Sequence, residues 1–417
     1  MLPFKSAKLY ILLFSMVYIL NPYTILGPLA LTLLPLAITP FLYRFKYLET
    51  ESLAFPVLLV LLSLVGVFSS YWHGIGQLVH LKVSISVLIY IFLAYSAFVV
   101  AISRSFTFSD LVYVCLIVVF LNSLIILAQV SVPTLRGVVE NFLVPSGNVD
   151  WTQGFRYRGL ASGGGASLSV LIPVSLVLVL HLYAEKYIGL VKLITISSVL
   201  VLSMFFIGRT GFVLIPFVFL SFFFFNIRQY FIKVLVIFSV TPTLFFIFGD
   251  EIKSFIVGKY GVDFYNYSFG FFLGGLDGLK SEGTFGVILE FLRVMPTTLP
   301  EVLIGYGFYG GSDFYPWTDS GYSRMFLSVG YVFGVMFYLS FFMMFRNVIF
   351  VKKFLFLTIG LLLLIAETKE PLLFSGYASR LYIMLLVFAL LEKNFERYKM
   401  RMNKSEFSTS SHRLKVF

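Results

Sequence analysis

The sequence is poor in the residues that soluble enzymes use for their chemistry. Charged residues make up only 12% of the 417 residues, there are four histidines, and Cys115 is the one cysteine. A single cysteine excludes an intrachain disulfide and a cysteine-based metal site. The histidines are scattered along the chain, so we expect no metal site and no cofactor. The P-loop, GxGxxG, HExxH and GxSxG patterns of soluble enzymes are also missing.

Apolar side chains dominate what is present. They make up 59% of the sequence, the mean hydropathy is +0.95, and there are 50 Phe and 25 Tyr. A soluble globular chain is far less apolar, so the composition predicts an all-α integral membrane protein. The net charge of +11 does not indicate a nucleic-acid partner, because Lys and Arg are spread between the apolar blocks and gather only in the C-terminal tail.

The spacing of the apolar blocks predicts about twelve transmembrane helices, since a helix needs roughly 20 apolar residues to cross a bilayer. The predicted spans are 8–23, 26–43, 53–72, 83–102, 111–131, 166–184, 188–207, 211–227, 231–249, 325–345, 353–367 and 371–391. They define a polytopic domain over residues 1–392, followed by a basic cytoplasmic tail over 393–417.

The distribution of basic residues predicts the orientation. With both termini in the cytoplasm, twelve Lys and Arg fall on the inner side and six on the outer side, leaving aside the tail and the longest external loop. This topology predicts long external segments at about 132–165 and 250–324. Within the second, apolar residues at helical spacing over 285–292 predict an amphipathic helix along the membrane surface.

Arginines in the predicted external segments are candidate ligands of a phosphate group. Arg156 and Arg158 precede a glycine run at 163–165, and Arg209 lies in a Gly-Arg-Thr-Gly turn. The planar, permanently charged fork of arginine matches pairs of phosphate oxygens, and glycine N–H groups at a helix start also favour anions. Arg158 and Arg209 are therefore predicted catalytic residues. The predicted substrate-binding residues are Arg156, Arg293, Arg324, Arg380 and Tyr322.

Structural roles are the alternatives for the same residues. Arg209 also fits an interfacial anchor that extends its charge to the headgroups, and Arg156 and Arg293 also fit solvated loop positions. Arg380 lies within the last predicted span, where a lone cation is costly. Its structural alternative is an ion pair with Glu367 or Glu370.

Asp319 is the best-placed external carboxylate for activating a sugar hydroxyl. It directly precedes the tenth predicted span, in a Thr-Asp-Ser-Gly-Tyr stretch at 318–322. A general base must come within hydrogen-bond distance of the hydroxyl proton. Asp319 is therefore the third predicted catalytic residue, and an N-cap role is its structural alternative.

Together these motifs resemble the polysaccharide polymerase (Wzy) family and its relative, the O-antigen ligases. The resemblance covers residues 154–340. It rests on Arg158-Gly159 before a small-residue helix start, on Gly208-Arg209-Thr210-Gly211, and on Gly305-Tyr306-Gly307 followed by Thr318-Asp319-Ser320-Gly321-Tyr322.

The resemblance implies a metal-independent membrane glycosyltransferase of GT-C-like architecture in a bacterial plasma membrane. Such an enzyme transfers a growing glycan from undecaprenyl pyrophosphate onto a carrier-linked oligosaccharide, in the synthesis of O-antigen, capsule or exopolysaccharide. Arg158, Arg209 and Arg293 would hold the pyrophosphate, and Asp319 would lie near the acceptor hydroxyl. The expected partners are the carrier-linked oligosaccharide, membrane lipids, a flippase and a chain-length regulator.

Two other functions fit a chain of this kind. A flippase for the same lipid-linked unit also has about twelve spans, but transporters usually show repeated halves, and no repeat is visible here. A ligase would transfer finished glycan to another acceptor. Ligases of this superfamily usually carry an external histidine, whereas this chain has Asp319 and no histidine between His181 and His412.

Overall fold

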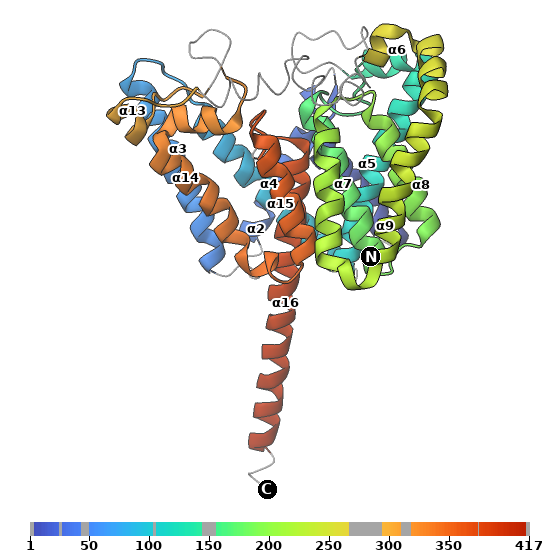
Figure 1. Ribbon diagram of the computed structural model, residues 1–417. Coiled ribbons are helices and arrows are strands. Elements are labelled where there is room, and N and C mark those ends of the chain that lie inside the picture. Colours follow the sequence, from blue (N-terminus) through green and yellow to red (C-terminus); the bar gives the residue numbers. More distant parts are fainter. Residues whose placement is uncertain are drawn as a thin grey trace.

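The fold is a bundle of helices, shown as a computed structural model in Figure 1. The structure describes residues 4–24, 27–42, 50–102, 106–143, 156–266, 294–309, 318–373 and 375–413. Its helices are α1 (Phe4–Leu20), η1 (Leu29–Ile38), α2 (Thr39–Leu42), α3 (Thr50–Trp72), α4 (Val79–Ile102), α5 (Phe108–Ser131), α6 (Pro133–Phe142), α7 (Ala166–Ala184), α8 (Leu190–Met204), α9 (Thr210–Tyr260), α13 (Leu299–Ile304), α14 (Gly321–Ile349), α15 (Lys353–Glu367) and α16 (Tyr377–Arg413). The strands β1 (Tyr23–Thr24) and β2 (Gly27–Pro28) form a two-residue antiparallel hairpin.

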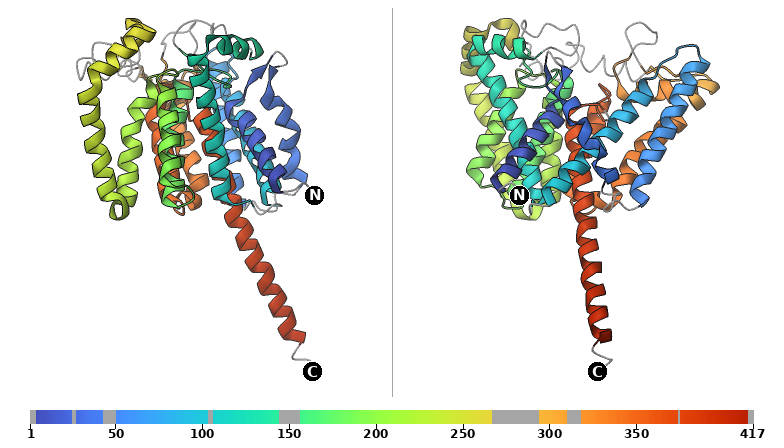
Figure 2. Two further views of the ribbon diagram at one scale, coloured as in Figure 1. Left: turned by 90° about the vertical axis from the view of Figure 1, so that its right-hand side faces the viewer. Right: turned by 180° about the vertical axis from the view of Figure 1, so that it is seen from behind.

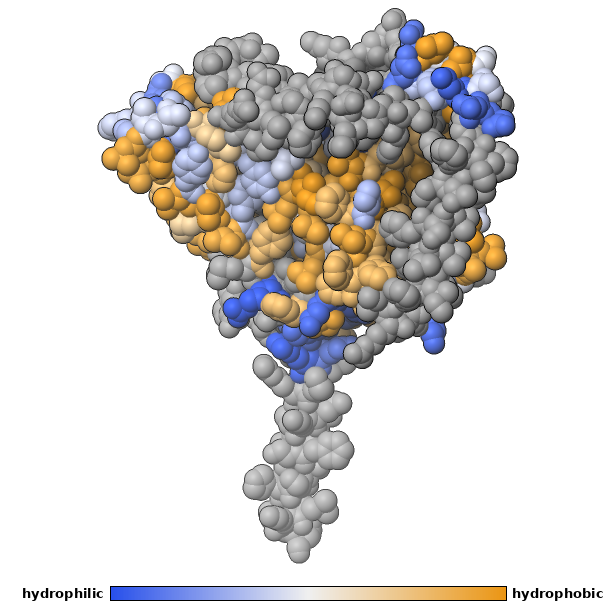
Figure 3. All heavy atoms as spheres, viewed as in Figure 1, coloured by the Kyte–Doolittle hydropathy of each residue, from blue (hydrophilic) through white to orange (hydrophobic). Residues whose placement is uncertain are grey.

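The helices confirm an all-α membrane protein. Four stretches in the described residues are long and apolar enough to cross a bilayer: Val79–Ile102, Phe108–Ser131, Ala166–Ala184 and Gly321–Ser340. Large apolar side chains such as Leu202, Leu339 and Leu361 are exposed on the outer faces of helices. Figure 3 shows apolar side chains over much of the described surface of this face, with hydrophilic residues toward its two ends. This distribution is typical of a lipid-facing surface.

The helix α16 forms the centre of the bundle. It packs against α1, α4, α5, α7, α14 and α15, and its residues from Leu381 to Phe388 are buried. Helices α7, α8 and α9 lie on one side of it, and the pair α3 and α14 lies on the other (Figure 1). Beyond the bundle α16 continues as a helix to Arg413, so the basic tail extends the last span.

Both termini lie at one end of the bundle, and α6 and α13 lie at the other (Figures 1 and 2). We call these the terminal end and the pocket end. The starts of α7, α9, α14 and α16 are all at the pocket end, which therefore gathers several helix N-termini. Two predicted spans, 211–227 and 231–249, form the two arms of α9. Its backbone leaves helical geometry at Asn226, and Phe206 at the pocket end contacts both Tyr260 and Phe264.

The helix boundaries agree with the sequence for some spans and differ for others. Helices α7 and α15 begin and end at the predicted residues, whereas the described part of the predicted span 26–43 consists of β2, the 3₁₀ helix η1 and the short α2. Prolines at 28, 35 and 40 explain this difference, because each removes a backbone donor from a regular helix. The count of twelve spans stays a prediction.

The predicted external segments contain more helix than expected. Residues 133–142, predicted to lie in a loop, form α6, and the second arm of α9 continues to Tyr260 instead of ending near 249. Pro133 favours the start of α6, since proline fits the first turn of a helix. The predicted amphipathic helix over 285–292 lies outside the described residues.

Helix α14 is broken at Gly330, where φ is 76°. The N–H groups of Tyr306 and Gly307 donate to the carbonyls of Leu327 and Ser328, so the break leaves these carbonyls satisfied. A Cβ on Gly330 would collide with the backbone of the α13 end. The Gly-Tyr-Gly motif at 305–307 is thus part of a packed joint between two elements.

Candidate functional site

The starts of α7 and α9 are held against each other at the pocket end. The Ser169 hydroxyl donates to the carbonyl of Gly208 and accepts from the N–H of Gly211, both at 2.7 Å. A Cβ on Gly211 would collide with Ser169, so the glycines of the Gly-Arg-Thr-Gly turn allow this close approach. The two residues between them, Arg209 and Thr210, begin α9 beside the first turn of α7.

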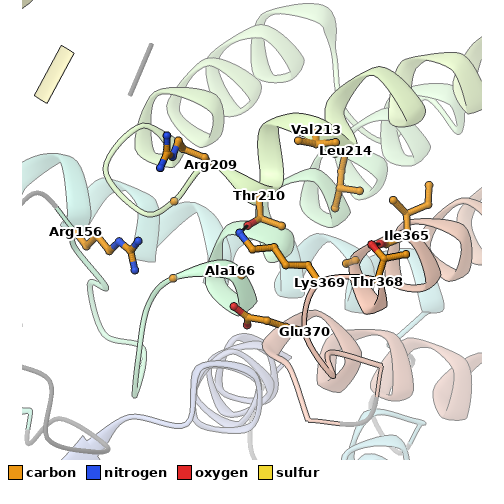
Figure 4. A pocket seen from close by; sticks show the side chains of 13 residues that line it. Arg156, Ala166, Arg209, Thr210, Val213, Leu214, Ile365, Thr368, Lys369 and Glu370 are labelled. Atoms are coloured by element: carbon orange, nitrogen blue, oxygen red, sulfur yellow. Dashed lines mark hydrogen bonds between the residues drawn. The ribbon is translucent and has the colours of Figure 1, made fainter. Parts of the chain in front are cut away.

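A pocket of about 170 Å³ opens between these helix starts and the end of α15. The cationic side chains among its described lining residues are Arg156, Arg209 and Lys369, and Glu370 also lines it (Figure 4). Its remaining polar groups include Thr210 and the backbone at the starts of α7 and α9. Helix N-termini favour anions, because their first N–H groups have no partner within the helix. Cations and two helix starts therefore face one small space.

Part of the lining of the same pocket is apolar. Val213 and Leu214 come from the first two turns of α9, and Ile365 and Ala366 come from the last turn of α15. The pocket thus offers positive charge from loops and helix ends, and apolar contacts from helices that run into the bundle. Such a combination suits a ligand with an anionic head and an apolar chain.

Lys369 and Glu370 enter the pocket because Glu367 fixes the turn that carries them. The buried Glu367 carboxylate accepts from the N–H groups of Leu372 and Leu373, both at 2.7 Å, and from the Tyr338 hydroxyl at 3.0 Å. Helix α15 therefore ends at Glu367 and α16 begins only at Tyr377. The Lys369 ammonium donates to the Thr210 hydroxyl at 3.1 Å, which ties the turn to the start of α9.

The charges around the pocket act on one another. Burial lowers the pKa of Lys369, and the nearby charges of Arg156 and Arg209 lower it further, whereas Glu370 opposes the shift. Burial also raises the pKa of Glu370, and Lys369 opposes that shift. A second anion in the pocket would stabilise the charged form of Lys369. The site is therefore electrostatically prepared for a negative ligand.

No family model matches this chain, and no curated protein or solved structure matches it either. Membership of the polysaccharide polymerase family thus stays a prediction from the motifs.

Arg158 lies away from this pocket, in a buried ion pair. Its side chain is 0% exposed, and its Nε donates to Glu140 Oε2 at 2.9 Å. The two terminal nitrogens donate to the carbonyls of Ser162 at 3.0 Å and Leu143 at 2.6 Å. Arg158 thereby links α6 to the loop before α7. These contacts give it a structural role in the described protein.

Asp319 and Arg324 form an ion pair of 2.9 Å at the start of α14. Arg324 also donates to the carbonyl of Thr318, and Ser320 is the N-cap of the helix, so the N-cap alternative for Asp319 is wrong. The charge of Asp319 raises the pKa of both Lys369 and Glu370, which places this pair near the pocket. Tyr322 donates to the carbonyl of Leu364 and so joins α14 to α15.

Arg380 is in the first turn of α16, because the helix begins six residues later than the predicted span. Its guanidinium lies over the rings of Tyr90 and Tyr377, at 5.1 and 5.5 Å from their centroids. The structural alternative, an ion pair with Glu367 or Glu370, does not occur among the described residues, and the Glu367 carboxylate accepts instead from the 372–373 backbone and Tyr338. Arg293 lies outside the described residues.

The sequence predictions missed Lys369 and Glu370 as site residues. Their signal was a Lys-Glu-Pro triplet that interrupts an apolar stretch between α15 and α16. Arg156 and Arg209, by contrast, were predicted ligands and lie together in the pocket. Among the described residues, no group of three or more His, Cys, Asp or Glu side chains is arranged to hold a metal ion.

Proposed function

We propose that this chain is a polysaccharide polymerase of a bacterial plasma membrane. It would transfer a growing glycan from undecaprenyl pyrophosphate onto the sugar of a second carrier-linked repeat unit. The observation that carries the proposal is the pocket in which Arg156, Arg209 and Lys369 meet the starts of α7 and α9. The product would belong to an O-antigen, a capsule or an exopolysaccharide.

The two-sided chemistry of the pocket favours a lipid pyrophosphate over a soluble anion. Arginine forks and an ammonium group match the pyrophosphate oxygens, and the apolar wall from α9 and α15 suits the first isoprene units. When the glycosidic bond to the carrier breaks, negative charge grows on the departing pyrophosphate. Fixed cations stabilise this charge without any reorganisation, which lowers the barrier without requiring a metal ion.

The proposal includes an orientation with the pocket end outside the cell. Both termini lie at the opposite end, in keeping with a cytoplasmic location for both. We further propose about twelve spans and a GT-C-like architecture, with the pocket at the membrane surface. A lipid-linked repeat unit delivered by a flippase would reach the pocket from the outer leaflet.

A flippase is the second candidate, and the break in α14 is the observation that favours it. Transporters often use discontinuous helices whose free ends bind substrate inside the membrane. Here the carbonyls next to the break are occupied by Tyr306 and Gly307, and the cations lie at the pocket end instead. The polymerase therefore fits the described residues better.

The test is a gene deletion complemented by variants of the pocket. Under the proposal, Arg209→Ala and Lys369→Ala leave normal amounts of protein in the membrane but yield glycan with single repeats on a ladder gel. Lys253→Ala is the matched control, because Lys253 is exposed on the second arm of α9, outside the pocket. Full ladders from both pocket variants would reject the polymerase. Repeat units left on the cytoplasmic face of the deletion strain would favour the flippase.

A further inference from the structure

The carboxylate of Glu370 differs from those of Glu367 and Asp319 in its hydrogen-bond partners. Glu367 accepts three hydrogen bonds and Asp319 is paired with Arg324. No group in the described part of the chain donates a hydrogen bond to the Glu370 carboxylate, which interacts with its neighbours only through charge. A half-buried carboxylate that lines a pocket without a donor has its lone pairs available for a ligand.

The position of Glu370 separates it from the arginine that would hold the leaving group. Figure 4 shows the Glu370 carboxylate and the Arg209 guanidinium on opposite sides of the pocket, with the Lys369 ammonium between them. If Arg209 and Lys369 bind the pyrophosphate, the sugar ring attached to it would lie on the side of the pocket where Glu370 is. A hydroxyl that attacks this sugar would then approach within the same pocket.

Asp319 is a poorer candidate for taking a proton from that hydroxyl. Its oxygen lies 2.9 Å from Arg324, whose own Nε donates to the carbonyl of Thr318. A substrate hydroxyl would therefore have to compete with the Arg324 guanidinium for this carboxylate. Asp319 also does not appear among the described residues that line the pocket.

We propose that Glu370 is the general base of the transfer, an assignment that rests on the proposed polymerase function. The Glu370 carboxylate takes the proton of the acceptor hydroxyl while that oxygen forms a bond to the anomeric carbon. The bond between this carbon and the carrier pyrophosphate breaks, and its electron pair leaves with the pyrophosphate. Arg156, Arg209 and Lys369 bind the released charge, and Glu370 then returns its proton to water.

The pH dependence follows from the groups that face Glu370. Burial and the negative charge of Asp319 raise the pKa of Glu370, and the positive groups around it act in the opposite direction. The positive groups whose charges act on Glu370 are Lys369, Arg324 and Arg156, and Arg209 also lines the pocket. A base works only when deprotonated, so the turnover rate of the wild type rises with pH until Glu370 has lost its proton. The raised pKa moves this rise above the range of an ordinary glutamate.

The experiment measures turnover and ligand binding separately, with the full chain in lipid nanodiscs. The substrate is the carrier-linked repeat unit extracted from the deletion strain, and farnesyl pyrophosphate is the binding probe. We expect Glu370→Gln to lower kcat by about 10²- to 10⁴-fold and to remove its rise with pH. We expect farnesyl pyrophosphate to bind Glu370→Gln at least as tightly as the wild type, because a negative charge has left an anion pocket.

Two further variants separate a base from a structural role. Glu370→Asp keeps the carboxylate on a shorter chain, so it should recover part of kcat and the rise with pH. Glu251→Gln removes an exposed carboxylate from α9 outside the pocket and should change neither quantity. A merely structural Glu370 would predict weaker farnesyl pyrophosphate binding by Glu370→Gln and no recovery by Glu370→Asp.

The possible failures are distinguishable. If the wild type forms polymer and Glu370→Gln turns over at the same rate, the base assignment is wrong and the polymerase stands. The same holds if Asp319→Asn, and not Glu370→Gln, loses the rise of kcat with pH. If the wild type forms no polymer from the extracted units, the polymerase is rejected and the base assignment with it.

Discussion

Two arginines from one short stretch, Arg156 and Arg158, end in opposite environments. Arg158 is buried, and its donors face the Glu140 carboxylate and two backbone carbonyls. Arg156 is exposed and lines a hollow together with Arg209 and Lys369. The residue type is the same, yet Arg158 is enclosed by protein groups whereas Arg156 lines a pocket. The surroundings of a charge, and not the charge alone, separate a buried structural contact from a position beside a cavity.

The largest expected effect is on protein stability, and it concerns the buried ion pair of Arg158 with Glu140. Arg158→Ala should lower the free energy of unfolding by about 3–5 kcal/mol, because Glu140 would remain buried without its partner. The measurement is denaturant or thermal unfolding in detergent micelles. Arg209→Ala should change stability much less. The proposed difference between the two arginines would be wrong if Arg209→Ala unfolds the protein and Arg158→Ala does not.

The next largest effect is on the binding of an anionic ligand in the pocket. Arg209→Ala should weaken farnesyl pyrophosphate binding by about 10- to 100-fold, since a hydrogen bond to a charged group contributes about 1.5–3 kcal/mol. Isothermal titration with protein in nanodiscs measures it, and Lys253→Ala is the control for a general loss of positive charge. Equal weakening by both variants would mean that the net charge of the surface, and not the pocket, attracts the anion.

A smaller effect on binding tests the contact between the turn after α15, which carries Lys369, and the start of α9, which carries Thr210. Thr210→Val removes the hydroxyl that accepts a hydrogen bond from Lys369 at 3.1 Å. The ammonium group then loses its fixed position, so the same titration should show an affinity lower by about two- to tenfold, the equivalent of roughly 0.5–1.5 kcal/mol. Thr210→Ser keeps the hydroxyl and should bind as the wild type does. Weak binding by Thr210→Ser would show that the methyl group matters instead.

The smallest effect concerns Glu301, a half-buried carboxylate that accepts several hydrogen bonds. Hydrogen bonds from the backbone of Thr297 and Thr298, and from the side chains of Thr298 and Tyr306, outweigh the effect of its burial and lower its pKa from 4.5 to about 2. Its stabilisation of α13 is thus present above pH 4.5 and is lost as the pH falls toward 2. We expect Glu301→Gln to speed amide hydrogen exchange in α13 at neutral pH, with global unfolding unchanged. Slower exchange would contradict the capping role.

The sequence predicted the apolar helices well because their signal is local. A run such as 166–184 carries its own length and hydropathy, and α7 has those bounds. Helix α6 was missed, since ten residues with Arg136 and Glu140 resemble a polar loop when the neighbouring elements are unknown. The start of α16 was placed too early, because the Glu367 side chain holds the 372–373 backbone in a turn, and the hydropathy of these residues does not indicate it.

The site was only partly predictable for the same reason. The Gly-Arg-Thr-Gly turn identified Arg209, whose neighbouring glycines are needed for the close approach of α9 to α7. The sequence assigned a catalytic role to Arg158 and a substrate-binding role to Arg156, and it could not show that the partner of Arg158 is Glu140, in a helix that the sequence did not indicate. Lys369 and Glu370 join the pocket through a tertiary contact with Thr210, which spans 159 residues.

The interrupted helix α14 has a consequence for how the nascent chain is assembled in its membrane. The carbonyls at the interruption are satisfied by Tyr306 and Gly307, and the preceding Gly305 accepts from Ser69, which the ribosome produces 236 residues earlier. A newly inserted α14 therefore completes its bent shape only after α3 is already in the lipid and available as a docking surface.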